Sequence, residues 1–322
     1  MRAALIILAA LLLVLATPSW AQAPPRIGWI GPGSASAAKD NLSAFKEGMQ
    51  QQGMVEGQHY VIDQRYAEGK YERFPALTSE LLARNPAVIM VVTIASVRAA
   101  QQATRTIPIV FVSTNDPVGS GLVANLARPE GNTTGLSTQA EDLVDKYVEL
   151  VRETLPRATR VAVLVNPGNP SGPKLFERVR ASAAGFGISL RAFEADSPHA
   201  LDVAFGAIAK HRADALLLIG DYMLFDQRDR IAAFALRQRT PMFAGSPQYA
   251  ASGALMTYGT SPTEMYRRSA AYVKQILAGA TPADLPVEQP TKFELVINLK
   301  TAKVLGISIP QSLLQRANEV IQ

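Results

Sequence analysis

Short apolar runs alternate with amphipathic stretches along most of the chain, and this alternation is what most constrains the fold. In the first half, the apolar runs predict strands, and the stretches with apolar residues at helical spacing predict helices. The predicted strands cover 26–31, 60–67, 88–92 and 107–113, and the predicted helices cover 37–52, 71–84 and 95–104. Such a series is typical of an α/β fold with a parallel, doubly wound sheet.

A second series of the same kind begins after residues 134–138. Its predicted helices cover 141–154, 172–186, 200–210 and 224–239, and its predicted strands cover 160–166, 188–195, 215–220 and 241–244. The tail adds an extended run at 255–259, helices at 262–277 and 301–305, a strand at 295–299 and a short helix after Pro310. Two similar half-chains in tandem predict two lobes of one architecture.

The tail indicates that the chain crosses between the lobes three times, near 135, 257 and 290. We therefore expect lobe 1 to comprise 24–136 plus 258–290, and lobe 2 to comprise 137–257 plus 291–322. Three connecting strands permit a hinge, and hinge closure around a ligand is a known mode of motion. Gly135 and Gly259 are either the flexible points of this hinge or ordinary turn residues.

The N-terminus has the three parts of a secretory signal peptide. A basic start is followed by an apolar run from Ala3 to Ala16 and by the cleavage-type triplet Ala21-Gln22-Ala23. The alternative, a membrane anchor, needs about 20 apolar residues, and this run is shorter. We expect cleavage after Ala23 and, because the chain has no cysteine for a lipid anchor, a periplasmic location.

Composition argues against several classes of function. The net charge is +5, but the basic residues are scattered over predicted helix faces, so no nucleic-acid partner is expected. The three histidines lie near helix or strand termini, and the chain has no Gly-x-Ser-x-Gly elbow, phosphate loop or His-x-x-x-His pair. The sequence therefore predicts a protein that is not an enzyme and needs no metal and no cofactor.

Small polar residues gather where the predicted strands end. Open α/β sheets bind ligands at the carboxyl ends of their strands, so these positions predict a site in the cleft between the lobes. The candidates include Ser34, Thr93, Ala95, Ser96, Ser113, Asn115 and Asp116 from lobe 1, and Asn166, Asp221, Tyr222 and Gln248 from lobe 2.

Several of these candidates have a purely structural alternative. Ser34 and Ser96 stand where helices begin and are equally suited to cap them. Asp116 precedes Pro117, a pair that often starts a turn. Asp221 follows an apolar strand and either accepts hydrogen bonds from a ligand ammonium or caps the next helix.

The residues taken together resemble the ABC-transporter substrate-binding family whose best-understood members take up tryptophan and other aromatic amino acids. The resemblance covers nearly all of the chain after residue 23. Its most specific parts run from Asp116-Pro-Val to Asn132-Thr-Thr-Gly135 and through the tail Asn298-Leu-Lys-Thr-Ala-Lys303. It implies a type I periplasmic binding protein with two Rossmann-like lobes, parallel sheets and a three-strand hinge.

The resemblance also implies roles for individual residues. A ligand carboxylate would be held by Thr93, Ala95, Ser96, Ser113 and Asn115, and Asp221 would take the ammonium. The implied function is that of a monomeric receptor that binds a small solute, expected to be an amino acid, and delivers it to an ABC permease in the inner membrane. An aromatic amino acid is the narrower expectation. A sensory protein that presents the ligand to a membrane kinase or chemoreceptor, and a binder of an aromatic carboxylate, remain alternatives.

Overall fold

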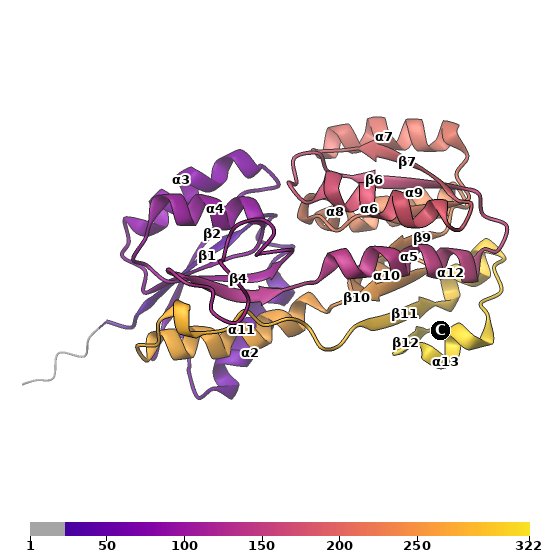
Figure 1. The fold of residues 1–322 in the computed structure, drawn as a ribbon. Coiled ribbons are helices and arrows are strands. Elements are labelled where there is room, and N and C mark those ends of the chain that lie inside the picture. The colour runs from indigo at the N-terminus through magenta and orange to yellow at the C-terminus, as the bar shows by residue number, and fades with distance from the viewer. Residues whose placement is uncertain (1–22) are drawn as a thin grey trace, which may run out of the picture.

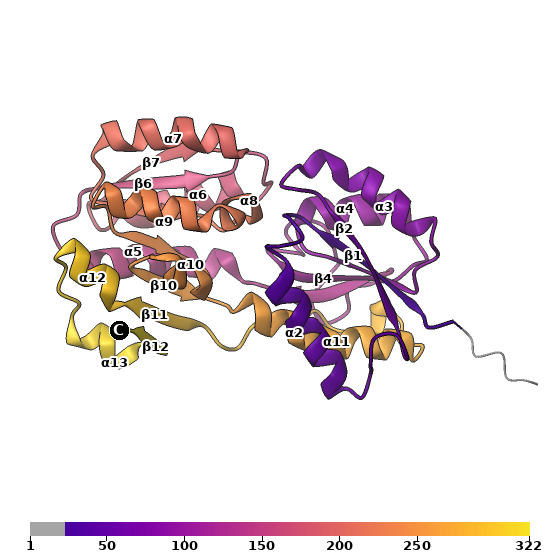
Figure 2. The ribbon, with the colours of Figure 1, turned by 180° about the vertical axis from the view of Figure 1, so that it is seen from behind.

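The computed structural model describes residues 23–322, which form two lobes side by side (Figures 1 and 2). Residues 1–22 of the expected signal peptide lie outside the described residues. Within 23–322, no helix combines the length and the apolar character needed to cross a bilayer.

Lobe 1 is built on a five-stranded sheet in the order β2-β1-β3-β4-β5, and every neighbouring pair is parallel. Its strands are β1 (Arg26–Gly31), β2 (Val61–Tyr66), β3 (Val88–Val91), β4 (Ile109–Thr114) and β5 (Thr133–Ser137). Its helices are α2 (Lys39–Gln51), α3 (Phe74–Leu82), α4 (Ile94–Ala103) and α11 (Pro262–Leu277), with the short 3-10 turns η1 (Tyr71–Arg73) and η2 (Pro282–Asp284).

Both faces of this sheet are buried, as the unbroken apolar runs predict. On β1, Ile27 and Trp29 pack into the core cluster shared with α2 and α11, while Ile30 packs into the cluster shared with α3 and α4. The helix α11 is far from lobe 1 in sequence, yet its Met265 and Val273 complete that lobe's core. Lobe 1 therefore depends on a segment that follows lobe 2 in the chain.

Lobe 2 is built on a seven-stranded sheet in the order β12-β11-β10-β9-β8-β6-β7, parallel except for the antiparallel pair β10–β11. Its strands are β6 (Arg160–Val165), β7 (Ser189–Glu194), β8 (Ala215–Leu218), β9 (Met242–Ala244), β10 (Met256–Gly259), β11 (Glu294–Asn298) and β12 (Glu319–Ile321). Its helices are α5 (Ala140–Thr154), α6 (Gly172–Ala184), α7 (Pro198–His211), α8 (Tyr222–Asp226), α9 (Arg228–Arg237), α10 (Pro247–Ser252), α12 (Leu299–Leu305) and α13 (Gln311–Arg316).

The chain passes between the lobes from β5 to α5, from β10 to α11, and back from η2 to β11 (Figure 1). Glu288, on the returning segment, bridges to Leu136 of β5, so two of the crossings run alongside each other. β10 continues to Gly259 in the second sheet, two residues beyond the crossing expected near 257. We propose the division of the lobes expected from the sequence, with boundaries close to 136, 257 and 290.

The secondary structure differs from the expected series at a few points. The helix expected over 224–239 begins at Tyr222 and is broken at Gln227 into α8 and α9. The short helix α10 and the edge strand β12 were not expected. Each is a single turn or a short strand, too brief to show a clear apolar period in the sequence.

Gly135 and Gly259 lie inside strands and have no space for a side chain. A Cβ atom on Gly135, whose φ is +151°, would lie 2.0 Å from the Phe111 carbonyl oxygen, and one on Gly259 would lie 1.8 Å from the Gly245 carbonyl oxygen. Both contacts are with backbone, which has little freedom to move aside. Close backbone approach is thus sufficient reason for glycine at both positions.

We predict that Gly135→Ala and Gly259→Ala each lower the free energy of unfolding by about 2 kcal/mol or more, because the strands must separate to admit the methyl group. Gly206→Ala is the control, since nothing lies within 4 Å of its Cβ position on α7 and alanine favours a helix. Urea denaturation should show a gain of about 0.5–1 kcal/mol for the control. Stabilities equal to wild type for the first two variants would contradict this packing argument.

Candidate functional site

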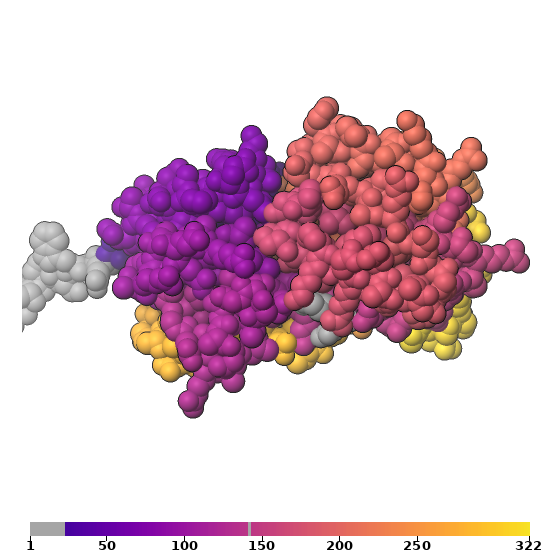
Figure 3. Space-filling view, turned by 45° about the horizontal axis from the view of Figure 1, so that its top comes forward, coloured from indigo at the N-terminus to yellow at the C-terminus, as the bar shows by residue number. Residues whose placement is uncertain are grey.

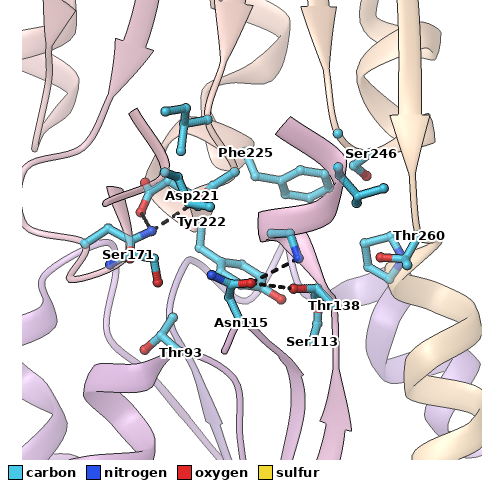
Figure 4. A pocket seen from close by; sticks show the side chains of 18 of the residues that line it. Thr93, Ser113, Asn115, Thr138, Ser171, Asp221, Tyr222, Phe225, Ser246 and Thr260 are labelled. Atoms are coloured by element: carbon cyan, nitrogen blue, oxygen red, sulfur yellow. Dashed lines mark hydrogen bonds between the residues drawn. The ribbon is translucent and has the colours of Figure 1, made fainter. Parts of the chain in front are cut away.

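A cavity of about 170 Å³ lies between the lobes, where the carboxyl ends of both sheets face each other (Figure 4). Its lining residues come from α2 and the segments around the ends of β3, β4 and β5 in lobe 1, from α5, α6 and the segments that follow β6, β8 and β9 in lobe 2, and from the segment that joins β10 to α11. This is where open α/β sheets place their ligands.

The polar side of the cavity includes the start of α4. Thr93 caps this helix: its hydroxyl accepts a hydrogen bond from the N–H of Ser96 at 3.1 Å, and the Ser96 hydroxyl accepts one from the N–H of Thr93 at 3.0 Å. This capping box leaves the N–H groups of Ile94 and Ala95, the first two residues of the helix, without intrahelical partners. Unpaired N–H groups at a helix N-terminus favour an anion.

A distortion at the end of β4 sets the position of Ser113. The register between β4 and β5 shifts between Phe111 and Thr114, and Ser113 has a φ of +59°, which is rare for a residue with a side chain. Such bulges redirect side chains next to functional sites. Here Ser113 lines the cavity beside Asn115, whose amide oxygen accepts a hydrogen bond from the N–H of Ala140 at 3.0 Å.

The side of the cavity formed by lobe 2 is largely apolar. α5 contributes its buried face, and the cavity is closed by residues of α6, α8 and α10. These apolar and aromatic residues are Leu143, Val144, Tyr147, Leu175, Phe225 and Tyr249. An apolar body of a ligand would lie against this wall, opposite the polar groups of lobe 1.

Asp221 is the one charged residue among the described residues that line this cavity. It is buried, with 7% of its surface exposed, and caps α8 by accepting hydrogen bonds from the N–H groups of Met223 at 2.9 Å and Leu224 at 3.1 Å. Asn166 and Asn169 donate to it at 3.0 and 3.2 Å. The capping role that the sequence left open is therefore realised in the structure.

The lobes are in direct contact beside the cavity, and they touch along their boundary on the face shown in Figure 3. The Tyr71 hydroxyl of lobe 1 donates to Asp221 of lobe 2 at 2.8 Å. The Tyr222 side chain of lobe 2 packs against the lobe 1 core cluster that contains Tyr266, and it lines the cavity together with Ser113. These contacts define a closed arrangement of the lobes.

Two further contacts join the lobes nearer the surface. The Lys174 ammonium lies 2.6 Å from the Asp116 carboxylate, which also accepts a hydrogen bond from the N–H of Gly119 at 2.8 Å. These two groups lower the pKa of Asp116 despite the opposing effect of burial. The N–H of Ser34 donates to Asp226 at 3.0 Å.

Five of the residues expected from the sequence line the cavity, namely Thr93, Ser113, Asn115, Asp221 and Tyr222. Six others are not among its lining residues: Ser34, Ala95, Ser96, Asp116, Asn166 and Gln248. Ser96 is fully buried in the capping box, and Asn166 contacts Asp221. Ser34 borders a neighbouring cavity of about 20 Å³, and Gln248 lies on α10, where it contacts Ser246.

The sequence did not identify the apolar wall. Leu143, Val144 and Tyr147 have the helical spacing of ordinary core residues, and Tyr147 does pack into the core of lobe 2. No signal in the sequence separates a helix face that meets a sheet from one that also meets a cavity. Among the described residues, no group of three or more His, Asp or Glu side chains is arranged to hold a metal ion.

Two α/β lobes that close on a cavity at the carboxyl ends of their sheets define a periplasmic-type binding protein, which holds a solute and does not transform it. Residues 32–321 match the family model described as "ABC transporter substrate binding protein", and the chain belongs to this family. It is a binding protein, and not an enzyme.

Known proteins of similar sequence and structure agree with this assignment. A conserved domain protein from Vibrio cholerae is 30% identical, with a TM-score of 0.85 over 92% of this chain and 99% of that one. A domain from Streptococcus pneumoniae, solved in complex with L-Trp, is 23% identical, with a TM-score of 0.85 over 92% of this chain and 100% of that one. A tyrosine-binding protein from Clostridioides difficile is 23% identical over 82% of this chain and 75% of its own length.

Asp226 provides a pH-dependent test of the closed arrangement. Burial raises its pKa from 3.8 to about 6, Glu68 and Asp221 add to this effect, and the Ser34 N–H and Arg228 oppose it. The folded protein thus binds this proton more tightly than the unfolded chain does. The resulting stabilisation is complete below about pH 4 and is lost as the pH rises through 6.

We predict that Asp226→Asn, which cannot ionise, raises the melting temperature at pH 7.5 and that this advantage shrinks towards zero at pH 4. Asp214→Asn is the control with the opposite sign. The N–H groups of Thr159 and Arg160 lower the pKa of Asp214 against the effect of burial. The wild type therefore gains stability from the ionised Asp214 as the pH rises through this range, and Asp214→Asn should fall further below wild type because asparagine cannot ionise. Thermal melts at four pH values test both, and a pH-independent effect of Asp226→Asn would contradict the prediction.

Proposed function

We propose that this protein is the periplasmic solute receptor of an ABC importer, and that its solute is an amino acid with an aromatic side chain. It binds the solute in the cavity between the lobes, closes over it and delivers it to a permease in the inner membrane. The observation that carries the proposal is the division of the cavity into a polar side and an apolar side.

The polar side suits a carboxylate. The free N–H groups of Ile94 and Ala95 lie at the N-terminus of α4, and the hydroxyls of Thr93 and Ser113 line the cavity nearby. Backbone N–H groups and hydroxyls stabilise an anion without a buried cation. Within the described residues, no Lys or Arg lines the cavity, so these neutral donors are the groups available for the carboxylate.

The apolar side suits an aromatic body. Tyr147, Phe225 and Tyr249 present rings to the cavity or border it, and aromatic side chains pack well against rings at offset or edge-on angles. Two relatives point the same way: the Clostridioides difficile protein is named tyrosine-binding, and the Streptococcus pneumoniae domain was solved with L-Trp.

The cellular context rests on the sequence and the family. The signal-type N-terminus supports export, and the family supports delivery to a permease. We propose that the receptor acts as a monomer without a nucleic-acid partner. A sensory role would use the same closed lobes with a different membrane partner, and no contact in the structure favours it.

A ligand screen tests the proposed function directly. Ligands that bind only the folded state raise the melting temperature by mass action. We expect a clear rise for the protein lacking residues 1–23 with L-tyrosine, L-tryptophan or both, and a smaller or absent rise with leucine, glutamate and glucose. Isothermal titration calorimetry then gives the affinity. If aromatic amino acids produce no shift while another solute does, the proposed ligand class is wrong.

A pair of variants at Thr93 tests where the carboxylate binds. Aspartate is a good helix cap, so Thr93→Asp keeps α4 capped while it places a negative charge beside the expected carboxylate. We predict a loss of affinity of at least tenfold, about 1.4 kcal/mol, because like charges repel strongly in a closed cleft. Thr93→Ser is the control and should stay close to wild type. Equal affinities of Thr93→Asp and wild type, measured by calorimetry, would show that the carboxylate lies elsewhere.

A further inference from the structure

Asp221 has no acceptor capacity left for a ligand ammonium in this structure. One carboxylate oxygen accepts hydrogen bonds from Met223, Leu224 and Asn166, and the other accepts from Tyr71 and Asn169. A carboxylate offers about four lone-pair sites, and here it meets five donors. Its charge is satisfied entirely by the protein.

Tyr71 is the donor that comes from the other lobe. It lies on η1 of lobe 1, and its hydroxyl donates to Asp221, the residue that caps α8 in lobe 2. Burial and the neighbouring Asp221 carboxylate raise the pKa of Tyr71 well above its usual value, so the hydroxyl remains a donor.

We propose that Tyr71 and Asp221 form an interlobe clasp that holds the receptor closed, and that Asp221 does not bind the ammonium of the ligand. The inference rests on the proposed function, because it concerns how an aromatic amino acid is retained. Asp221 and Tyr71 are positioning residues: they act on the ligand through the closed arrangement of the lobes. The clasp forms whether or not the ligand carries an amine.

The hydrogen-bond pattern favours the clasp over an ammonium site. A ligand ammonium could reach Asp221 only by displacing one of its donors. The N–H groups of Met223 and Leu224 belong to the first turn of α8 and cannot leave without unwinding it. Displacement of Asn166 would break a buried hydrogen bond, and displacement of Tyr71 would break the contact between the lobes. Each of these exchanges would break one hydrogen bond to Asp221 for every hydrogen bond that the ammonium forms with it.

The two roles of Asp221 predict different affinities when it is replaced. As an ammonium site it would matter only for a ligand with an amine, and as part of the clasp it would matter equally for a ligand without one. The probes are L-tyrosine and 3-(4-hydroxyphenyl)propionate, which is the same molecule without the amine. Calorimetry measures both affinities at pH 7.5 for wild type, Tyr71→Phe and Asp221→Asn, all without residues 1–23. Asparagine is as good a helix cap as aspartate, so Asp221→Asn is expected to fold.

The clasp predicts that each variant weakens both probes by the same factor, within about threefold, and that this factor is about tenfold for loss of a hydrogen bond to a charged group. It also predicts that the loss appears in the dissociation rate, since the clasp closes after the ligand has entered. Stopped-flow displacement followed by the fluorescence of Trp29, a core residue of lobe 1 that stacks on Tyr266, measures that rate.

An ammonium site at Asp221 predicts a different pattern. Truncating a buried charge pair costs roughly 30-fold or more in affinity. Asp221→Asn would then weaken L-tyrosine by that factor, leave the deaminated probe nearly unchanged, and overturn the inference. Unchanged dissociation rates in Tyr71→Phe would overturn it as well. If wild type binds neither probe, the proposed function itself fails, and the inference fails with it.

Two control variants separate the clasp from general effects. Tyr272→Phe also removes a tyrosine hydroxyl that makes one hydrogen bond, to the Pro286 carbonyl at 2.6 Å, away from the cavity, and should leave both affinities and rates at the wild-type level. Asp229→Asn removes one negative charge from the first turn of α9, at an exposed position that neither lines the cavity nor contacts lobe 1 through a hydrogen bond of its carboxylate in the part of the chain that the structure describes. The deaminated probe is an anion, whereas L-tyrosine has no net charge. Any gain in affinity for the anionic probe that Asp229→Asn shares with Asp221→Asn is therefore a general charge effect, and the comparison subtracts it.

Discussion

Both sheets of this protein are buried on their two faces, and this constraint determines where the chain can place polar function. On β1, β3, β6 and β8, alternate residues pack into opposite core clusters, so a polar side chain on either face would lose its hydration. The N-terminus of α4 and the hydroxyls of Thr93 and Ser113 lie at the carboxyl ends of the strands, where they line the cavity. The two lobes bring these ends together, and the cavity between them combines the polar edge of one lobe with an apolar helix of the other.

The same edges also supply the contacts between the lobes. Tyr222 begins α8 next to the capping residue Asp221, and its side chain packs against the core cluster of lobe 1 that includes Tyr266 on α11. Tyr71 meets the start of α8 from the other side. Asp221 thus both caps α8 and holds the lobes together, so helix capping and the contact between the lobes share this residue.

Parts of the site were predictable because they follow from local rules. Thr93, Ser113, Asn115, Asp221 and Tyr222 line the cavity because residues that follow buried strands must emerge at the ligand-binding edge. The fold class was predictable for a similar reason, since the strand and helix periods are local in sequence. The contact made by Tyr71 was not predictable. The sequence predicts Tyr71 as the first residue of a helix, and its partner Asp221 is 150 positions away.

The sequence by itself determined the α/β class, the two tandem lobes, the edge that carries the site and the resemblance to a family, because each depends on residues close together in the chain. Only the tertiary structure decided which groups are already satisfied. Whether Asp221 is open to a ligand depends on donors from η1, the loop after β6 and α8. The face of α5 that closes the cavity has the apolar spacing of an ordinary core helix. Hydrogen-bond saturation and shared cavities arise from segments that meet only when the chain folds.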